Sequence, residues 1–384
     1  MTIFTSEKIV MQGLTYDDVL LMPGYASFAR EDISLRTNLT RHITLEIPLV
    51  AAPMDTVTER RLAIALAKLG GIGIIHRNLT VADQALEVKA VKEAGYLIGA
   101  AVGASTGVEE RIRALVQAGV DVIVVDSAHG YAKPVIDTIR YIKSTHPETQ
   151  VIGGSVATYD GAKALIQAGA DALRVGMGPG AICTTRIVSG MGVPQITAIL
   201  ETARAGTEAG IPVIADGGIK YSGDMLKALA AGAHTVMMGS YFAATEESPG
   251  EVHQLTAQEI PSRFKSIVRK DQQMYTFKSY RGMGSEAAMK RGAEIKSEDE
   301  FHGKSYKERV LVAEGVEGLV PVRGTVQDLV DQAIGGLKSG MYYIGCSSIE
   351  EVRTKARFMQ ITQASLVESH PHNLLVTNPG KSYS

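Results

Sequence analysis

Short apolar runs alternate with amphipathic stretches along most of the chain. The runs are rich in Val, Ile and Ala and lack polar alternation, which is typical of strands buried on both faces. Eight runs are present, at 47–54, 71–76, 97–103, 120–127, 150–156, 170–176, 211–218 and 234–240. Apolar positions at helical spacing follow many of them, at 59–69, 82–95, 107–118, 132–144, 157–168 and 222–231.

This alternation predicts an α/β fold in which a parallel sheet is covered by helices. Eight strand–helix units close most naturally into a TIM (β/α)8 barrel. An open doubly wound sheet is the alternative, but it would place a glycine-rich phosphate loop after the first strand, and none follows residue 54. The 384 residues, 45% of them apolar and 40 of them glycine, fit one large core with many tight turns. We therefore expect one catalytic barrel domain over 1–384.

Two excursions interrupt this pattern after the eighth strand. Residues 251–280 are polar and become strand-like toward their end, and residues 290–313 are dense in Lys, Glu and Asp with little periodicity. Such a long charged segment is either a surface loop or a flap over a site, and composition leaves both open. Helical periodicity returns at 326–338, where Gly340 is expected to end the helix, and again at 348–359.

Charge and cysteine content exclude several function classes. The formal net charge is only −2, so no global basic field attracts nucleic acid. No apolar run is long enough to cross a membrane. Cys183 and Cys346 could form one disulfide at most, and the N-terminus lacks a signal-peptide pattern. Together these features favour a reducing cytoplasm.

Polar residues and glycines gather at the carboxyl ends of the predicted strands, where TIM barrels carry their active sites. Asp216, Gly217 and Gly218 follow the seventh strand, and Gly239 and Ser240 follow the eighth. This corner commonly binds phosphate, because backbone N–H groups of its turns can surround a phosphoryl group. The other strand ends supply Asp55, His76, Asp126, Ser127 and Ser155.

One cysteine lies in a glycine-rich loop after the sixth strand. Gly176, Gly178 and Gly180 precede Cys183 and leave backbone groups free to approach a ligand closely. The thiol is either a nucleophile or a small packing residue under a tight turn, since most free cysteines are buried and inert. Its place at a strand end favours the nucleophile.

Several motifs resemble those of the IMP dehydrogenase and GMP reductase family over nearly the whole chain. They include MDTVTE at 54–59, GGIGIIH at 70–76, DSAHG at 126–130, GMGPGAICTTR at 176–186, GVPQ at 192–195, ADGGI at 215–219, MGS at 238–240 and EGVEG at 314–318. The forms GMGPG, YRGMGS (280–285), TEESPGE (245–251) and ESHPHN (368–373) are closer to the dehydrogenase. Family members usually carry two regulatory CBS modules between the second and third strands. Here 82–95 runs straight into residue 97, so we expect no inserted CBS domain.

The resemblance implies a covalent mechanism. A thiolate adds to C2 of IMP, hydride passes to NAD, and the thioimidate is hydrolysed to XMP. It implies Cys183 as the nucleophile, with Thr185 and Glu314 as a proton-transfer pair. Reductases use the same pair, so NADPH-dependent reductive deamination of GMP to IMP stays open as an alternative. A non-catalytic relative that binds purine nucleotides is also open.

The resemblance also implies ligand contacts. The residues expected to bind substrate are Met54, Asp216, Gly218, Gly239, Ser240, Tyr280, Gly282, Met283, Gly284 and Glu314, and those expected to bind NAD are Asp126, Ser127, Gly176 and Gly178. A monovalent cation, usually K+, is expected on carbonyls of Gly178, Gly180 and Cys183, with Glu368, Ser369 and His370 from a neighbouring copy. This arrangement implies a homotetramer.

The chain departs from the family pattern at a few positions. The flap normally has an Arg-Tyr dipeptide whose arginine activates water, and none occurs between 289 and 314, where Lys304, Tyr306 and Arg309 are the nearest candidates. Ala52 and Ala181 stand where serines are usual, and Ser155 stands where asparagine is usual. Loss of one hydrogen bond to a phosphate weakens binding by about 1.5 to 3 kcal/mol.

Overall fold

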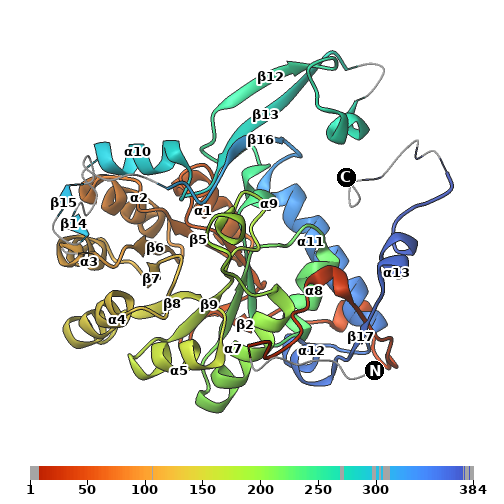
Figure 1. Ribbon diagram of the computed structural model, residues 1–384, viewed down its shortest axis with the longest axis horizontal. Helices are drawn as coiled ribbons and strands as arrows, with labels where there is room; N and C mark the ends of the chain where they lie inside the picture. The colour runs from red at the N-terminus through yellow and green to blue at the C-terminus, as the bar shows by residue number, and fades with distance from the viewer. Residues whose placement is uncertain are drawn as a thin grey trace.

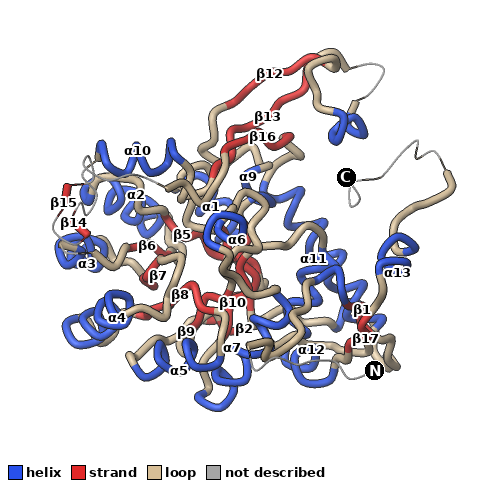
Figure 2. Tube along the Cα trace, in the orientation of Figure 1, coloured by secondary structure: helices blue, strands red, loops and turns tan. Residues whose placement is uncertain are grey.

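A computed structural model describes residues 8–105, 107–268, 272–295, 300–301, 304–305, 312–374, 376 and 380. Eight parallel strands form a closed barrel at its centre (Figures 1 and 2). They are β4 Leu49–Ala51, β5 Ile72–Ile75, β6 Gly99–Val102, β7 Val122–Asp126, β8 Gln150–Val156, β9 Ala172–Val175, β10 Val213–Asp216 and β11 Thr235–Met238. Each lies inside a predicted run, and β11 pairs with β4 to close the barrel. The predicted TIM barrel is confirmed and the open sheet is excluded.

Helices surround the strands as an outer ring (Figure 2). Those on the ring are α1 Arg60–Lys68, α2 Val81–Glu93, α3 Val108–Gln117, α4 Lys133–Thr145, α5 Tyr159–Gln167, α7 Gln195–Ala209, α8 Ser222–Ala230 and α11 Val326–Tyr343. Side-chain caps begin several of them, as where the Thr80 and Thr158 hydroxyls accept backbone N–H groups of the first turn. Because α2 ends only a few residues before β6, no domain is inserted between β5 and β6.

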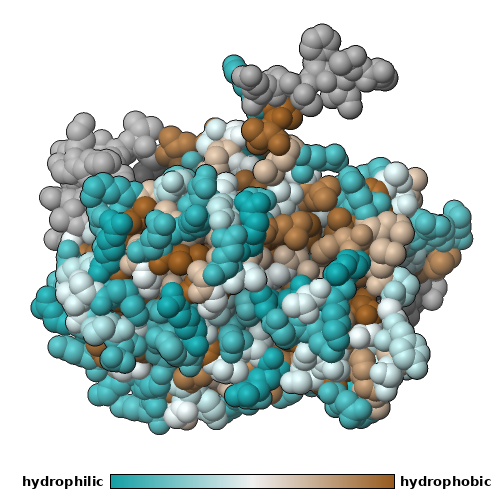
Figure 3. Space-filling view, turned by 90° about the horizontal axis from the view of Figure 1, so that it is seen from below, coloured by the Kyte–Doolittle hydropathy of each residue, from teal (hydrophilic) through white to brown (hydrophobic). Residues whose placement is uncertain are grey.

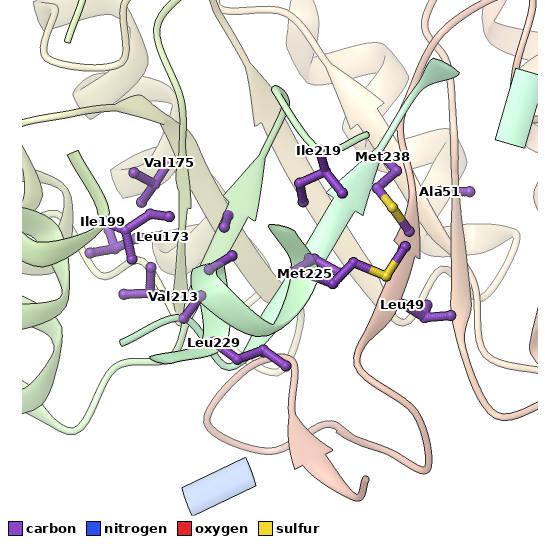
Figure 4. Packing of buried hydrophobic residues seen from close by; sticks show 14 of the residues in the cluster. Leu49, Ala51, Leu173, Val175, Ile199, Val213, Ile219, Met225, Leu229 and Met238 are labelled. Carbon is purple, nitrogen blue, oxygen red and sulfur yellow. The ribbon is translucent and has the colours of Figure 1, made fainter. Parts of the chain in front are cut away.

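Alternation along each strand separates two apolar layers. One side of each strand fills the barrel interior, with Val50, Ile74, Val124, Ile152, Ile214 and Met237 among its residues. The other side packs on the helices (Figure 4), where Ile199 of α7 lies near Leu173 and Val213. The same alternation turns the last residues of β7 and β10, Asp126 and Asp216, toward the interior, together with Arg174 of β9. The uppermost interior layer is therefore charged.

Short elements complete the barrel and its surroundings. The hairpin of β2 Thr37–Asn38 and β3 Thr44–Leu45 places Leu39 and Leu45 in the interior cluster, at the amino-terminal end of the strands. The remaining elements are η1 Tyr16–Asp18, β1 Val19–Leu21, η2 Arg30–Asp32, α6 Thr185–Ser189, α9 Ser240–Ala243, α12 Ile349–Lys355, β17 Phe358–Gln360 and α13 Gln363–Glu368.

Two predicted helix boundaries are wrong. Helix α11 passes through Gly340 and ends before Gly345, which has a left-handed φ of +69°. A Cβ at Gly340 would lie 2.5 Å from Leu226 Cδ2, so this glycine serves close packing of α11 on α8. The predicted helix 348–359 stops with α12 at Lys355, and the next residues form β17, which pairs with β1. That pairing is a long-range contact, which helical periodicity cannot reveal.

An antiparallel sheet projects from the barrel (Figure 1). It consists of β12 Val252–Thr256, β13 Met274–Arg281 and β16 Glu317–Pro321, and it packs around Ile260, Tyr275 and Phe277 with the short helix η3 Ser262–Ile267. We call this region, 251–281 with 317–321, the finger. Beyond it lie α10 Glu286–Glu294, β14 Glu300–Phe301 and β15 Lys304–Ser305. Tyr306 and Arg309 lie outside the described residues.

Most of the face seen in Figure 3 is hydrophilic, with apolar patches between the polar groups. Cys183 and Cys346 are both free thiols. Within the described ranges, no helix combines the length and the apolar character needed to cross a membrane.

Candidate active site

The loop after β9 is built around the guanidinium of Arg186. This group donates hydrogen bonds to the carbonyl oxygens of Met177, at 3.2 Å, and Val193, at 2.7 Å. A Cβ at Gly178 or at Gly192 would lie 2.6 Å from Arg186 Cγ, so both positions require glycine. Gly178, which was predicted to expose backbone groups, therefore also makes room for an arginine inside the loop, as does Gly192, which was not singled out in that prediction.

Backbone hydrogen bonds join this loop to two segments that come much later in the chain. The amide of Thr184 donates to the Glu314 carbonyl at 2.9 Å, and the amide of Val316 donates to the Ile182 carbonyl at 2.9 Å. The amide of Glu314 in turn donates to the Gly284 carbonyl at 3.0 Å. The base of the finger and the cysteine loop thus form one connected unit.

The three predicted catalytic residues form a hydrogen-bonded chain. The Cys183 thiol donates to Thr185 Oγ1 at 3.2 Å, and the Thr185 hydroxyl donates to Glu314 Oε2 at 2.9 Å, across 129 residues of sequence. Thr185 is buried, whereas Cys183 is only half-buried. A thiol that is accessible and linked through a hydroxyl to a carboxylate can pass its proton along the chain and become a nucleophile.

The phosphate corner brings together residues from four strand ends. Gly217 and Gly218 have left-handed φ values of +91° and +77°, and a Cβ on Gly217 would lie 3.1 Å from Pro179 of the cysteine loop. A Cβ at Gly239 would lie 2.7 Å from the Tyr280 hydroxyl and 2.8 Å from Met54 Sδ. Met54, Gly239 and Tyr280 are thus in contact, as expected for one binding site.

Tyr280 connects the finger to this corner. Its side chain is 5% exposed and hydrogen-bonds Ser240. Burial, and to a lesser degree the charge of Asp216, raise the pKa of the Tyr280 hydroxyl far above its ordinary value. The group is therefore a neutral hydrogen-bond donor at physiological pH.

Two carboxylates at the barrel mouth bind the same arginine. Arg174 Nε lies 2.8 Å from Asp216 Oδ2, and Arg174 Nη1 donates to Asp126 Oδ1. Burial alone would raise the pKa of Asp126, but Arg174 and Arg77 hold it below its ordinary value. Burial raises the pKa of Asp216, and Arg174 offsets this only in part because the charge of Asp126 adds to the increase.

The predicted cation ligands divide into two groups. In the described part of the chain, the carbonyl oxygens of Gly178 and Cys183 accept no hydrogen bond, and that of Gly180 accepts one from the Cys183 amide at 3.0 Å. Carbonyl oxygens that lack partners fit a hard monovalent cation. Glu368, Ser369 and His370 lie at the end of α13, well away from α6 in the same chain (Figure 2). Their contribution from a second copy stays a prediction.

Sequence reasoning missed three supporting residues. Arg174 and Arg186 are described above, and Gln195 donates from Nε2 to the carbonyl oxygens of Val175, at 2.9 Å, and Asp216, at 3.0 Å. A signal for Arg174 was available, because a charged residue interrupts an otherwise apolar strand at an inward position. Arg186 and Gln195 act on backbone carbonyls across loops, which no local pattern reveals.

The fold and the site define the class: a (β/α)8 barrel with a free thiol, a hydroxyl and a carboxylate aligned at its mouth. A family model described as "IMP dehydrogenase / GMP reductase domain" matches residues 13–372, and the chain belongs to this family of oxidoreductases.

Relatives named inosine-5'-monophosphate dehydrogenase match over almost their full length. The protein of Cryptosporidium parvum is 42% identical over 420 residues, that of Aquifex aeolicus 38% over 505 and that of Escherichia coli K12 36% over 503. Each comparison covers 98% of this chain and 99% of the relative. All three comparisons extend over more than the 384 residues of this chain. Those relatives therefore contain segments without a counterpart here, in agreement with the direct passage from α2 to β6.

Proposed function

We propose that this protein oxidises IMP to XMP with NAD through a covalent adduct on Cys183. The observation that carries the proposal is the chain of hydrogen bonds from the Cys183 thiol through Thr185 to Glu314. Family membership and relatives named as IMP dehydrogenases give the substrate class. We also propose that the chain acts as one catalytic unit, with the finger and the 290–313 segment as excursions from the barrel.

The geometry supports distinct roles for the three residues. Thr185 and Glu314 would take the thiol proton, which lets the sulfur add to C2 of the purine. NAD, when bound, supplies the acceptor for the hydride that leaves C2. Once that proton has been released to solvent, the same pair would remove a proton from the water that hydrolyses the thioimidate, and that proton would return to the leaving sulfur. In this second role, Thr185 and Glu314, which already lie beside the sulfur, would activate water in place of the missing flap arginine.

The substrate residues would lie around one mononucleotide. Backbone amides at Gly218 and Gly239, with Ser240 and the neutral Tyr280 hydroxyl, fit a phosphate. Asp216 fits the ribose, because a carboxylate accepts hydrogen bonds from vicinal hydroxyls. Met54, Gly282, Met283, Gly284 and Glu314 would contact the base.

Asp126 and Ser127 would bind the nicotinamide ribose, with Gly176 and Gly178 beside them. The fit of a dinucleotide rests on Asp126, since its neighbouring arginines keep this carboxylate ionised and able to accept hydrogen bonds from ribose hydroxyls. We further propose a K+ ion on the carbonyls of Gly178, Gly180 and Cys183, completed by Glu368, Ser369 and His370 of a second copy in a homotetramer. Cellular location stays a prediction.

The replaced serines differ in their surroundings. Ala52 is buried among the apolar residues of the barrel interior, whereas Ala181 is exposed on the cysteine loop. Ser155 is buried, and its amide donates to the Ser127 carbonyl at 2.7 Å. We infer that Gly218, Gly239, Ser240 and Tyr280 carry the phosphate without the usual extra hydroxyls.

An assay with two substrate pairs tests the proposal. Purified protein is supplied with IMP and NAD in a K+ buffer, and NADH absorbance is followed, with formation of XMP checked by chromatography. Steady NADH production is expected. If NADPH is consumed with GMP and NAD is not reduced with IMP, the protein is instead a reductase. A single burst of NADH without turnover would show that Thr185 and Glu314 do not activate water, and inactivity with both pairs would leave only a binding protein.

A further inference from the structure

The uppermost layer of the barrel interior has an unusual composition. Asp126, Gly154 and Arg174 lie in register across three neighbouring strands, since Asp126 pairs with Gly154 and Gly154 pairs with Arg174. A Cβ on Gly154 would lie 2.8 Å from Arg174 Cβ. Only a residue without a side chain therefore lets Arg174 extend across β8 and reach Asp126 on β7.

Arg174 reaches a second carboxylate on its other side. Its Nε lies 2.8 Å from Asp216 on β10, while Nη1 binds Asp126. The side chains of Arg174, Asp126 and Asp216 are only 13%, 12% and 18% exposed. A guanidinium has five N–H donors in a rigid fork, so it can bind two carboxylates at once, which a lysine ammonium does less well.

Each carboxylate keeps one oxygen that Arg174 does not bind. Arg174 binds Oδ2 of Asp216 and Oδ1 of Asp126, and Oδ2 of Asp126 lies 3.6 Å from Arg77 Nε. The carboxylate oxygens that Arg174 does not bind are those that can accept hydrogen bonds from ribose hydroxyls. The two proposed ribose sites thus depend on one shared cation.

We propose that Arg174 is a positioning residue that couples the mononucleotide site at Asp216 to the dinucleotide site at Asp126, by serving as the counter-ion of both carboxylates. The proposal rests on the ribose roles given to these aspartates in the proposed function. Without Arg174, two partly buried negative charges face each other and one of them retains a proton. Affinity for both nucleotides then falls together.

Among the residues that the structure describes, few other ionisable groups face this cluster. Arg77 faces Asp126 and not Asp216. Tyr16 of η1 and Tyr280 of the finger lie near Asp216, and burial raises the pKa of both hydroxyls, so they stay neutral between pH 6.5 and about 9. Ionisation of the ligand itself is the same for every variant, so a difference in pH dependence between a variant and the unaltered protein over that range reports on the two carboxylates.

The test measures IMP binding by calorimetry without cofactor, together with KM for IMP and for NAD. Arg174→Gln is expected to raise the IMP dissociation constant and both KM values about tenfold or more at pH 7. This loss should shrink as pH rises, because deprotonation restores an ionised Asp216. Unchanged affinity, or an equal loss at every pH, would contradict a counter-ion role.

Two further variants make the test specific. Asp126→Asn in the Arg174→Gln background removes the repelling charge, so IMP should bind more tightly to the double variant than to Arg174→Gln, although NAD should not. Arg77→Gln is the matched control, because it removes a cation that faces Asp126 alone; KM for NAD should rise while the IMP dissociation constant stays within about twofold. Equal weakening of IMP binding by Arg77→Gln, or no rescue by Asp126→Asn, overturns the coupling.

Stability and proposed function are checked separately. If Arg174→Gln unfolds at a much lower temperature, Arg174→Lys is measured in its place, because it retains a cation. Arg174→Lys should bind IMP with intermediate affinity, and this affinity should depend less on pH. If its affinity depends on pH as strongly as is expected of Arg174→Gln, the result counts against the proposal. If the unaltered protein neither binds nor oxidises IMP, the proposed function fails and the coupling fails with it. If it does both and the double variant shows no rescue, the coupling alone fails.

Discussion

The two ends of the barrel use the same kinds of residue in opposite ways. At the amino-terminal end, Asp121 binds Lys92 Nζ at 2.8 and 2.9 Å and accepts the Ile98 amide at 2.9 Å. Asp171 likewise binds Lys143 at 3.0 Å and accepts the Val151 amide at 2.9 Å. Each carboxylate there has its own cation and its own backbone donor. At the carboxyl-terminal end, Asp126 and Asp216 share one arginine.

Strand β7 displays this contrast within a few residues, since Asp121 precedes it and Asp126 ends it. Carboxylates with their own partners join strands to helices and have little capacity left for a ligand. At the mouth, Arg174 serves both carboxylates and Asp126 has Arg77 in addition, so each carboxylate keeps an oxygen that Arg174 does not bind. The difference identifies the first end as structural and the second as functional, in agreement with the general rule for barrels.

The largest expected effect comes from removing the thiol at the functional end. Cys183→Ala should lower kcat by more than about a thousandfold, because no other group can form the covalent adduct. IMP binding and the unfolding midpoint should change little, since the side chain is half-buried and small. Turnover and calorimetric binding measure both properties.

Cys346→Ala is the matched control. Cys346 is fully buried just after α11, where its thiol contacts the Ile344 carbonyl, and it takes no part in the chain of hydrogen bonds at the mouth. This variant should keep its turnover and lose only some stability. Turnover retained in Cys183→Ala, or lost in Cys346→Ala, would refute the covalent role of Cys183.

The next largest effect concerns the proton pair at the seam between barrel and finger. Thr185→Val and Glu314→Gln should each lower kcat by about 10² to 10⁴, with a smaller change in the IMP dissociation constant. Thr185→Ser keeps the hydroxyl and should recover most of the rate. Steady-state and burst kinetics separate adduct formation from its hydrolysis. Near-normal steady-state rates in both Thr185→Val and Glu314→Gln would show that another group activates the water.

Smaller effects should distinguish the two ends directly. Asp171→Asn leaves Lys143 without its carboxylate and should lower the free energy of unfolding by about 2 kcal/mol, with kcat and KM unchanged. Asp216→Asn at the mouth should weaken IMP binding about tenfold and change stability less, because Arg174 still binds Asp126. Denaturant unfolding measures the stability of both variants, and IMP titration measures their affinity for the substrate. A reversed pattern would remove the functional distinction between the ends.

Most of the fold could be predicted from the sequence because its signals are local. All eight strands lie within apolar runs that report burial on both faces, and the glycine-rich turns mark strand ends. The helix end predicted at Gly340 was wrong because this glycine allows close packing against Leu226 and does not terminate the helix. Strand β17 was not predicted because the strand that it pairs with, β1, lies near the other end of the chain.

The candidate site could be predicted only in part. Motifs supplied Cys183, Thr185 and Glu314, and the structure brings these three into contact. The motifs did not show that Asp126 and Asp216 share a cation, because that depends on which side of β9 Arg174 faces and on the absent side chain at Gly154. Strand alternation, applied to all eight strands together, would have indicated the charged layer.

The smallest effect tests the structural end by pH. His234 precedes β11, and its Nδ1 accepts the Val213 amide at 3.1 Å, which requires an uncharged nitrogen. Burial, with a contribution from Arg353, lowers the pKa of His234 from 6.5 to about 3. The unfolded chain therefore binds the proton first, so this contribution to stability is complete above about pH 6.5 and is lost as pH falls toward 3.

Between pH 7 and 5.5 this loss amounts to about 1 kcal/mol. His234→Asn keeps a side-chain acceptor that cannot be protonated, so its unfolding free energy should fall less over that interval than that of the unaltered protein. Guanidinium titrations at the two pH values give the difference. The IMP dissociation constant should be the same for both proteins at each pH, because His234 lies at the opposite end of the barrel from Arg174. An equal pH slope in both proteins would mean that burial does not hold the His234 ring neutral in the folded state, and that His234 adds nothing to the pH dependence of stability.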